Sequence, residues 1–347
     1  MKTPASFRRV FGIAILALLA TACDKNTDPN DPDDPNNPQN PDALGLAVSV
    51  RVDPNTFRTT GEFDLELLPT TKEGVSLVNE QWTITNALTA PSGASASLLS
   101  QGVPTSDPRP ISLALLVDNS SSMSTNDPDR ERASAAQTLF QSLVQANPAN
   151  RGALLHFGLG IIQPTPGFTR TRILRNWTSN AAELVGHLDT LSIGTGSPLY
   201  AATLEVAKWM DTTAGAATGT RRVLVLMSDG LGNDPGGREA LLAAATAANV
   251  QIYTVGLGAG SDRSTRTDPT AVTAMQTLAN GTGGLYAGAA TAERLGSVLQ
   301  SFVVSGGRLV ARFKLATVPA ASTSISGTVK LENNRGIAQA PWTFVAP

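Results

Sequence analysis

The sequence predicts an α/β protein: a central, open, mainly parallel β-sheet with helices on both faces, between two β-rich flanks. Short apolar runs alternate with amphipathic helical patterns from Pro110 to Ser305, as expected for a parallel sheet. The segments on either side instead alternate apolar and polar residues with the period of half-buried strands. Several apolar runs end abruptly in polar residues, at the sheet edge where open α/β folds bind ligands.

The amino end predicts a secretory signal peptide over residues 1–22. It has a basic start, an apolar run too short to span a bilayer as a helix, and small residues before a cleavage point: Lys2, Arg8, Arg9, Val10–Leu19 and Ala20–Ala22. Cys23, the only cysteine, follows in a position that resembles a bacterial lipobox, although Ala20 stands where Leu is usual. The resemblance implies that Cys23 is lipidated and anchors the exported protein to a cell-envelope membrane. Cleavage by ordinary signal peptidase, leaving a free thiol, is the alternative.

Residues 23–43 predict a disordered tether rich in Asp, Asn and Pro. Its prolines recur at every third position, which matches the turn of a polyproline II helix: Pro29, Pro32, Pro35, Pro38 and Pro41. Such a segment holds a domain away from a membrane, unless it is a linker without a length requirement. Removing residues 1–22 changes the formal net charge from −2 to −5, so we expect no nucleic-acid partner.

The flanks, residues 44–104 and 307–347, predict strands and carry no cluster of ionisable residues. The strongest alternating positions are Leu46, Val48 and Val50; Phe63, Leu65 and Leu67; and Leu309, Ala311 and Phe313. Weaker signals lie at Trp82–Ile84, up to Leu99, at Ile325–Leu331 and at Trp342–Val345. Neither flank alone supplies enough strands for a sandwich. We expect the two together to form one immunoglobulin-like β-sandwich with the central domain inserted, the alternative being two small β modules.

The central region opens with Ile111–Val117, a short apolar run typical of a buried strand, although periodicity alone does not exclude a helix. A helix is expected next, with Asp127 as its N-cap and Pro128 at its first position. The remaining predicted elements are strands at Ala153–Phe157, Ile173–Trp177 (an edge strand), Val223–Met227, Ile252–Val255 and Leu285–Tyr286, and helices at Ala181–Leu191, Pro198–Met210, Arg238–Ala248, Thr270–Ala279 and Thr291–Val303.

A carboxylate and two hydroxyls follow the first central strand at spacing i, i+2, i+4: Asp118, Ser120 and Ser122. Their oxygens are hard ligands that suit Mg²⁺, Mn²⁺ or Ca²⁺. The alternative is a Ser-rich loop in which Asp118 caps a turn. This D-x-S-x-S stretch resembles the metal-ion-dependent adhesion site (MIDAS) of von Willebrand factor type A (VWA) domains. The resemblance implies a VWA (Rossmann-like) fold over residues 108–306.

Two further motifs match the positions where that family places metal ligands. Gly194–Tyr200 resembles the family's G-T-x-L-Y helix start, with Ser197 in the ligand position and Thr195 as the alternative. Ser197 would also serve as the N-cap of that helix, with Pro198 at its first position. Val223–Gly230 is an apolar run ending in Ser-Asp-Gly, which resembles the family's T-D-G and assigns Asp229 to the site. The alternative is that Asp229 lies in a simple turn.

The resemblance implies a non-enzymatic binding or adhesion protein that recognises a protein partner through a divalent cation, Mg²⁺ or Mn²⁺ before Ca²⁺. An acidic side chain of the partner would complete the cation's coordination, and no small-molecule substrate is expected. A purely structural metal site and a metal-dependent hydrolase are the alternatives. Hydrolysis would require a general base, and both histidines, His156 and His187, lie in segments typical of structural residues. The charged loop 262–268 is a candidate for additional partner contacts.

Overall fold

The computed structural model describes residues 44–71, 76–102, 109–160, 164–185, 194–212, 219–232, 234–262, 264, 266–289, 295–296, 298–299 and 308–347. The predicted signal peptide, Cys23, the tether and His187 lie outside the described residues. So does the end of the predicted helix at Ala181–Leu191. Of the predicted helix at Thr291–Val303, the described residues 295, 296, 298 and 299 are helical.

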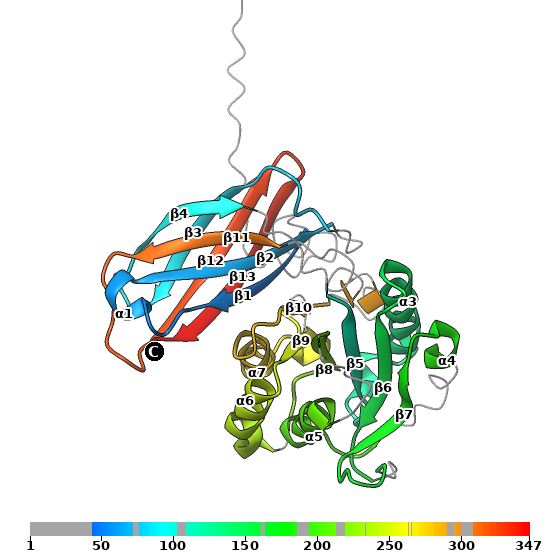
Figure 1. Cartoon of the computed structure of the whole chain (residues 1–347). Coiled ribbons are helices and arrows are strands. Elements are labelled where there is room, and N and C mark those ends of the chain that lie inside the picture. Colours follow the sequence, from blue (N-terminus) through cyan, green and yellow to red (C-terminus); the bar gives the residue numbers. More distant parts are fainter. Residues whose placement is uncertain are drawn as a thin grey trace, which may run out of the picture.

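The predicted α/β class is confirmed by five parallel strands at the centre of one sheet (Figure 1). In sheet order they are β10 (Tyr286–Gly288), β9 (Val250–Gly256), β8 (Arg221–Ser228), β5 (Ile111–Asp118) and β6 (Arg151–Phe157). The antiparallel strand β7 (Thr171–Thr178) closes the edge beyond β6, where an edge strand was predicted. Strand β5 is buried along its whole length because β6 and β8 pair with it on either side and helices cover both faces of the sheet.

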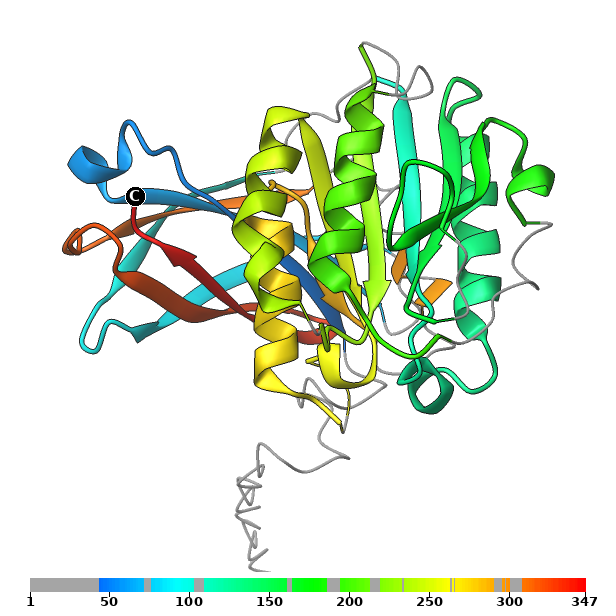
Figure 2. The same ribbon diagram turned by 90° about the horizontal axis from the view of Figure 1, so that it is seen from below.

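Helices cover both faces of these strands (Figure 2). On one face lie α3 (Glu131–Ala146) and α4 (Ala181–Val185), and on the other α5 (Leu199–Thr212), α6 (Arg238–Ala247) and α7 (Pro269–Asn280). Alternate residues of β5 serve the two faces: Leu113, Leu115 and Val117 contact the α3 side, whereas Ala114 and Leu116 contact the α5 side. None of the described helices combines the length and the apolar character needed to cross a membrane.

Helix α3 begins four residues after Asp127, later than predicted, and a short helix α2 (Met123–Asn126) precedes it. Arg130 takes a left-handed conformation (φ 59°), so the chain makes a turn before the helix can start. The Asp127 carboxylate nevertheless accepts hydrogen bonds from the backbone N–H groups of Glu131 (2.6 Å) and Arg132 (3.3 Å). The predicted helix start was therefore wrong, because Arg130 is the N-cap residue and Pro128 lies before the helix. The Asp127 carboxylate still binds the first N–H groups of the helix, but across an intervening turn.

The flank strands form two antiparallel sheets around a common core. One comprises β4 (Ala96–Gly102), β11 (Leu309–Leu315), β2 (Glu62–Thr70) and β1 (Gly45–Arg51), with the short helix α1 (Phe57–Thr60) between β1 and β2. The other comprises β13 (Gly336–Val345), β12 (Ser324–Asn333) and β3 (Thr83–Ala90). Strand β11 pairs with β2 and β4, and β12 pairs with β3, so each sheet contains strands from both flanks. Within the described residues the flanks therefore form one module rather than two.

The flank module and the central strands share one sheet. The sequence did not predict this connection. Strand β1 pairs antiparallel with β10 at Val48 and Tyr286, so ten strands of the described chain form one continuous sheet. Six of the seven residues of β1 are buried, on both faces of the strand, because the strand lies at the seam. Leu46, Val48 and Val50 pack into the flank core, whereas Ala47 packs into the core beneath α3.

Candidate metal centre

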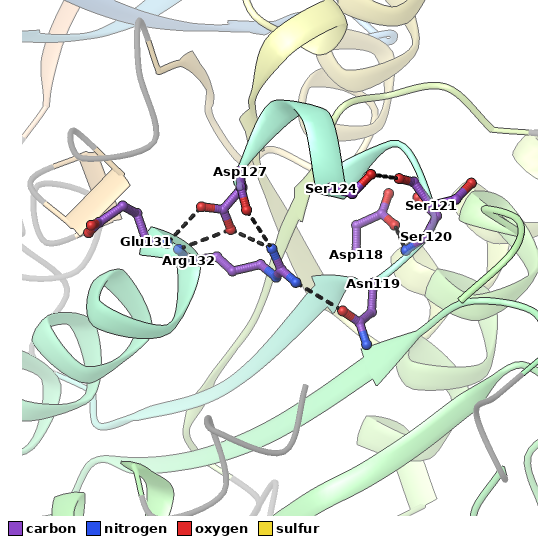
Figure 3. Close-up of polar contacts among 8 residues, drawn as sticks. All are labelled: Asp118, Asn119, Ser120, Ser121, Ser124, Asp127, Glu131 and Arg132. Atoms are coloured by element: carbon purple, nitrogen blue, oxygen red, sulfur yellow. Dashed lines mark hydrogen bonds and ion pairs between the residues drawn. The ribbon is translucent and has the colours of Figure 1, made fainter. Parts of the chain in front are cut away.

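The centre of the candidate site is Asp118, the last residue of β5. Its neighbours β6 and β8 run parallel to β5, so Asp118 lies in the middle of the carboxyl edge of the sheet. The side chain is completely buried, and its Oδ1 accepts a hydrogen bond from the Ser120 backbone N–H at 2.9 Å (Figure 3). This bond folds the polar segment back over the carboxylate immediately before α2 begins.

Hydroxyl groups from three segments surround Asp118. Ser197 Oγ donates to Asp118 Oδ2 at 3.2 Å, and Ser228 Oγ, at the end of β8, donates to the same oxygen at 2.6 Å. Ser120 Oγ and Ser122 Oγ lie 3.0 Å apart. Four of the five predicted site residues, Asp118, Ser120, Ser122 and Ser197, are thus joined by hydrogen bonds.

The fifth predicted residue, Asp229, follows β8 and is also completely buried. Its carboxylate accepts hydrogen bonds from Asn126 Nδ2 (3.0 Å) and from the Leu231 backbone N–H (3.2 Å). The pKa of Asp118 is raised to about 6. Burial is the main cause and the negative charge of Asp229 adds to it, whereas hydrogen bonds from Ser228 and Ser120 act in the opposite direction. Asp229 is therefore close enough to Asp118 for the two carboxylates to repel each other.

Contacts within the loop before α5 place the side chains of Ser197 and Thr195 differently. The Gly194 N–H donates to the Asn119 carbonyl at 2.6 Å, and the Thr195 N–H donates to the Leu159 carbonyl at 2.7 Å. These bonds hold the loop against the end of β5, with the Ser197 hydroxyl on Asp118. The Thr195 side chain instead lies against Gly160, where a Cβ atom would meet Thr195 Oγ1 at 3.0 Å.

Asp234, rather than Ser197, caps the amino end of α5. Its carboxylate oxygens accept hydrogen bonds from the backbone N–H groups of Tyr200 (3.2 Å) and Ala201 (2.6 Å). Because this distant carboxylate satisfies the helix start, the Ser197 hydroxyl is available to Asp118. The sequence analysis missed this role because Asp234 follows α5 in the chain and reaches its start only through the fold.

Ser228 and Asn126 are two further site residues that the sequence analysis missed. Because Ser228 precedes Asp229 in the Ser-Asp-Gly motif, the sequence places it close to the site. The sequence does not indicate that its hydroxyl points toward Asp118. The Asn126 side chain packs against Gly258 and so reaches Asp229. A Cβ atom at Gly258 would lie 2.4 Å from Asn126 Cγ. Gly258 also has a left-handed backbone conformation (φ 58°), which favours glycine.

The chemistry of the cluster fits a divalent cation. The five predicted ligands offer two buried carboxylates and three serine hydroxyls, which are hard oxygen donors of the type that Mg²⁺, Mn²⁺ and Ca²⁺ prefer. Within the described part of the chain, neither Asp118 nor Asp229 forms an ion pair with Lys or Arg. The described residues contain no group of three or more His, Cys, Asp or Glu side chains, so a cation here would depend on serine hydroxyls.

Two other predicted features lie near this edge. His156, in β6, is buried, and its Nδ1 lies 3.4 Å from Asn119 Nδ2, which agrees with the predicted structural role. In the loop 262–268, Asp268 caps α7, Asp262 contacts the Tyr286 hydroxyl, and exposed Arg266 donates to the Thr125 carbonyl at 3.2 Å. Of the described residues of this loop, Arg266 therefore contacts α2.

A family model for the von Willebrand factor type A domain matches residues 112–293, a little over half of the chain. The chain therefore belongs to the von Willebrand factor type A domain family. No curated protein matches it.

Several solved structures resemble the chain. The ArnB paralog VWA2 from Sulfolobus acidocaldarius is 15% identical, with 88% of this chain and 75% of that chain covered and a TM-score of 0.42. The pilus adhesin SpaC from Lactobacillus rhamnosus GG is 12% identical, with coverages of 86% and 47% and a TM-score of 0.42. An aerotolerance-related membrane protein from Bacteroides fragilis NCTC 9343 is 17% identical, with coverages of 56% and 99% and a TM-score of 0.40.

Proposed function

We propose that this protein is a membrane-tethered, extracytoplasmic binding or adhesion protein that recognises a protein partner through a divalent cation. Asp118, Ser120, Ser122, Ser197 and Asp229 hold the cation. The observation that carries this proposal is the hydrogen-bonded cluster of Asp118 with Ser120, Ser122 and Ser197, beside a second buried carboxylate. A cation between the carboxylates would remove their mutual repulsion. The tether is proposed from Cys23 and residues 23–43.

The chemistry of the partner follows from the donor count. Two carboxylates and at most three hydroxyls leave at least one position of an octahedral Mg²⁺ or Mn²⁺ ion open. A Glu or Asp side chain of the partner fills that position and neutralises the remaining positive charge. Ca²⁺, which accepts more oxygen ligands, is a further candidate.

The absence of catalysis is part of this proposal. Hydrolysis at a metal site requires a group that accepts a proton close to the activated water. Among the described residues, the one histidine is His156, which is 2% exposed and contacts Asn119. Burial, Arg172 and Arg132 lower the pKa of His156 to about 4.

The first prediction tests cation and partner binding together. Calorimetric titration of the purified chain with Mg²⁺ or Mn²⁺ should show one binding site that Asp118→Ala abolishes. A crosslinking pull-down from envelope extracts should capture a partner in Mg²⁺ but not in EDTA. Asp268→Asn is the matched control: this carboxylate caps α7 in the neighbouring loop, and Asn caps a helix equally well, so cation binding should persist.

Equal capture of the partner in Mg²⁺ and EDTA would contradict the proposal. If EDTA lowered the melting temperature while capture continued, the cation would be purely structural. Metal-dependent cleavage of a phosphoester or peptide substrate, lost in Asp118→Ala, would instead indicate a hydrolase.

A further inference from the structure

Asn119, which separates Asp118 from Ser120, is held at all four of its polar groups. Its backbone N–H donates to the Phe157 carbonyl at 2.9 Å, and its carbonyl accepts from the Gly194 N–H at 2.6 Å. Its side-chain Oδ1 accepts from Arg132 Nη2 at 3.0 Å, and its Nδ2 lies 3.4 Å from His156 Nδ1. Since Asn119 is also completely buried, the position of the two adjoining site residues depends on these contacts.

The Arg132 guanidinium lies behind the loop, completely buried, and forms an ion pair with the equally buried Asp127 (Nη1 to Oδ2, 2.5 Å; Figure 3). Burying both charges is unfavourable, and a well-packed hydrophobic pair is often at least as stabilising. A contribution to the free energy of unfolding therefore does not explain why this ion pair is present. Its specific effect is geometric, because the rigid, forked guanidinium contacts Asn119 and Asp127 simultaneously.

The second contact of Arg132 leads to the opposite side of the site. The Asp127 backbone N–H donates to the Met123 carbonyl at 2.9 Å and so ends α2. The residue before it, Asn126, donates to the Asp229 carboxylate. Arg132 thus contacts Asn119, which lies between Asp118 and Ser120. It also contacts Asp127, whose neighbour Asn126 donates to Asp229.

We infer that Arg132 is a positioning residue of the cation site. Through Asn119 it fixes Asp118 and Ser120, and through Asp127 and Asn126 it fixes the Asp229 carboxylate. This inference rests on the proposed function, because it concerns the same site. Arg132 contacts neither Asp118 nor Asp229 and would not touch the cation itself.

Titration of the full chain with Mn²⁺, followed by electron paramagnetic resonance, measures both the affinity and the geometry around the ion. Arg132→Met and Asn119→Ala should each weaken Mn²⁺ binding about 10- to 100-fold, as is typical when partners of metal ligands are removed, and should change the spectrum of the bound ion. Arg132→Lys keeps the charge but loses the forked geometry, so its binding should be weakened as well.

Phe140→Leu is the control, because it alters the buried face of α3 without touching the polar contacts of Arg132. It should reduce stability but leave the affinity and spectrum of bound Mn²⁺ unchanged. Should Arg132→Met fail to fold, Asn119→Ala decides, because it leaves the ion pair with Asp127 in place.

Wild-type Mn²⁺ affinity and spectrum in folded Asn119→Ala and Arg132→Met would overturn the inference while the proposed function stands. Full affinity in Arg132→Lys would also overturn it, because charge alone would then suffice. If the wild-type chain bound neither Mn²⁺ nor Mg²⁺, the proposed function would fail, and this inference with it.

Discussion

The ionised form of the Asp118 side chain is unfavourable in the folded protein when no cation is bound. Its carboxylate is completely buried at the sheet edge, and its pKa is raised to about 6 by burial and by Asp229. Such a group favours the protonated native state. Its stabilising contribution is present below the unfolded pKa of 3.8 and is lost as pH rises through about 6. A cation beside the ionised carboxylate would reverse this loss at neutral pH.

We therefore predict how Asp118→Asn changes stability without divalent cations. Relative to the wild type, the free energy of unfolding of the variant should rise by about 2 kcal/mol between pH 4 and pH 7, because Asn cannot ionise. Titrating groups that do not interact with Asp118 cancel in this difference. Urea unfolding in EDTA at several pH values measures it. A pH-independent difference would contradict the raised pKa. With saturating Mg²⁺ at pH 7, the wild type should be the more stable protein.

At the scale of elements, the loop after β9 packs against Asp229 at the candidate site. It forms the 3₁₀ turn η3 (Gly258–Gly260), and a Cβ atom at Gly260 would lie 2.7 Å from the backbone of Asp229. The spacing Gly256, Gly258, Gly260 does not match a dinucleotide-binding loop, and the fold gives these glycines a different purpose. Because they have no side chains, the backbone of the η3 turn packs closely against Asp229, and the Asn126 side chain has room beside it.

Gly258→Ala should affect both stability and cation binding. The left-handed backbone alone should lower the free energy of unfolding by about 1–2 kcal/mol. The added methyl group also displaces Asn126 from Asp229, so Mg²⁺ affinity measured by calorimetry should fall.

Gly102→Ala, at the end of β4, is the matched control, because a Cβ atom there meets no neighbour within 4 Å. It should leave Mg²⁺ affinity unchanged and should not lower the free energy of unfolding, because Ala fits an ordinary strand conformation at least as well as Gly. Lower stability of Gly258→Ala with undiminished Mg²⁺ affinity would show that Asn126 does not orient Asp229.

At the scale of the whole molecule, the two modules are joined by polar contacts as well as by β1. Arg308, just before β11, donates to the Glu66 carboxylate in β2 and to the Tyr253 hydroxyl in β9. Its guanidinium also lies 5.2 Å from the centre of the Tyr253 ring. Both members of the ion pair are 17% exposed, so solvent screens this pair less than a surface pair.

Arg308→Met should therefore lower the free energy of unfolding by about 1.5–3 kcal/mol, the usual contribution of hydrogen bonds to charged groups. Mg²⁺ affinity should stay unchanged, because these contacts lie away from Asp118. Arg312→Met, four residues along the chain in β11, is the matched control: Arg312 is 50% exposed and pairs with Asp64 within the flank sheet. Its removal should change stability by about 1 kcal/mol at most. Similar losses in both variants, measured by urea unfolding, would refute a special role of Arg308 at the seam.

The sequence by itself determined the order of strands and helices and the residues at strand ends. Buried strands such as Ile111–Val117 are continuous apolar runs, and turns require Asp, Ser and Gly, so both signals are local. Asp118, Ser120, Ser197 and Asp229 were identifiable for that reason.

Only the tertiary structure decided which side chains meet. The hydroxyls of Ser197 and Ser228 reach Asp118 across 79 and 110 residues of chain, and Arg132 reaches Asn119 from α3. The continuous sheet through β1 and β10 depends on a single pairing between distant strands. Such contacts depend on strand register and helix packing, which arise from the burial of the whole chain and leave no pattern in any short segment.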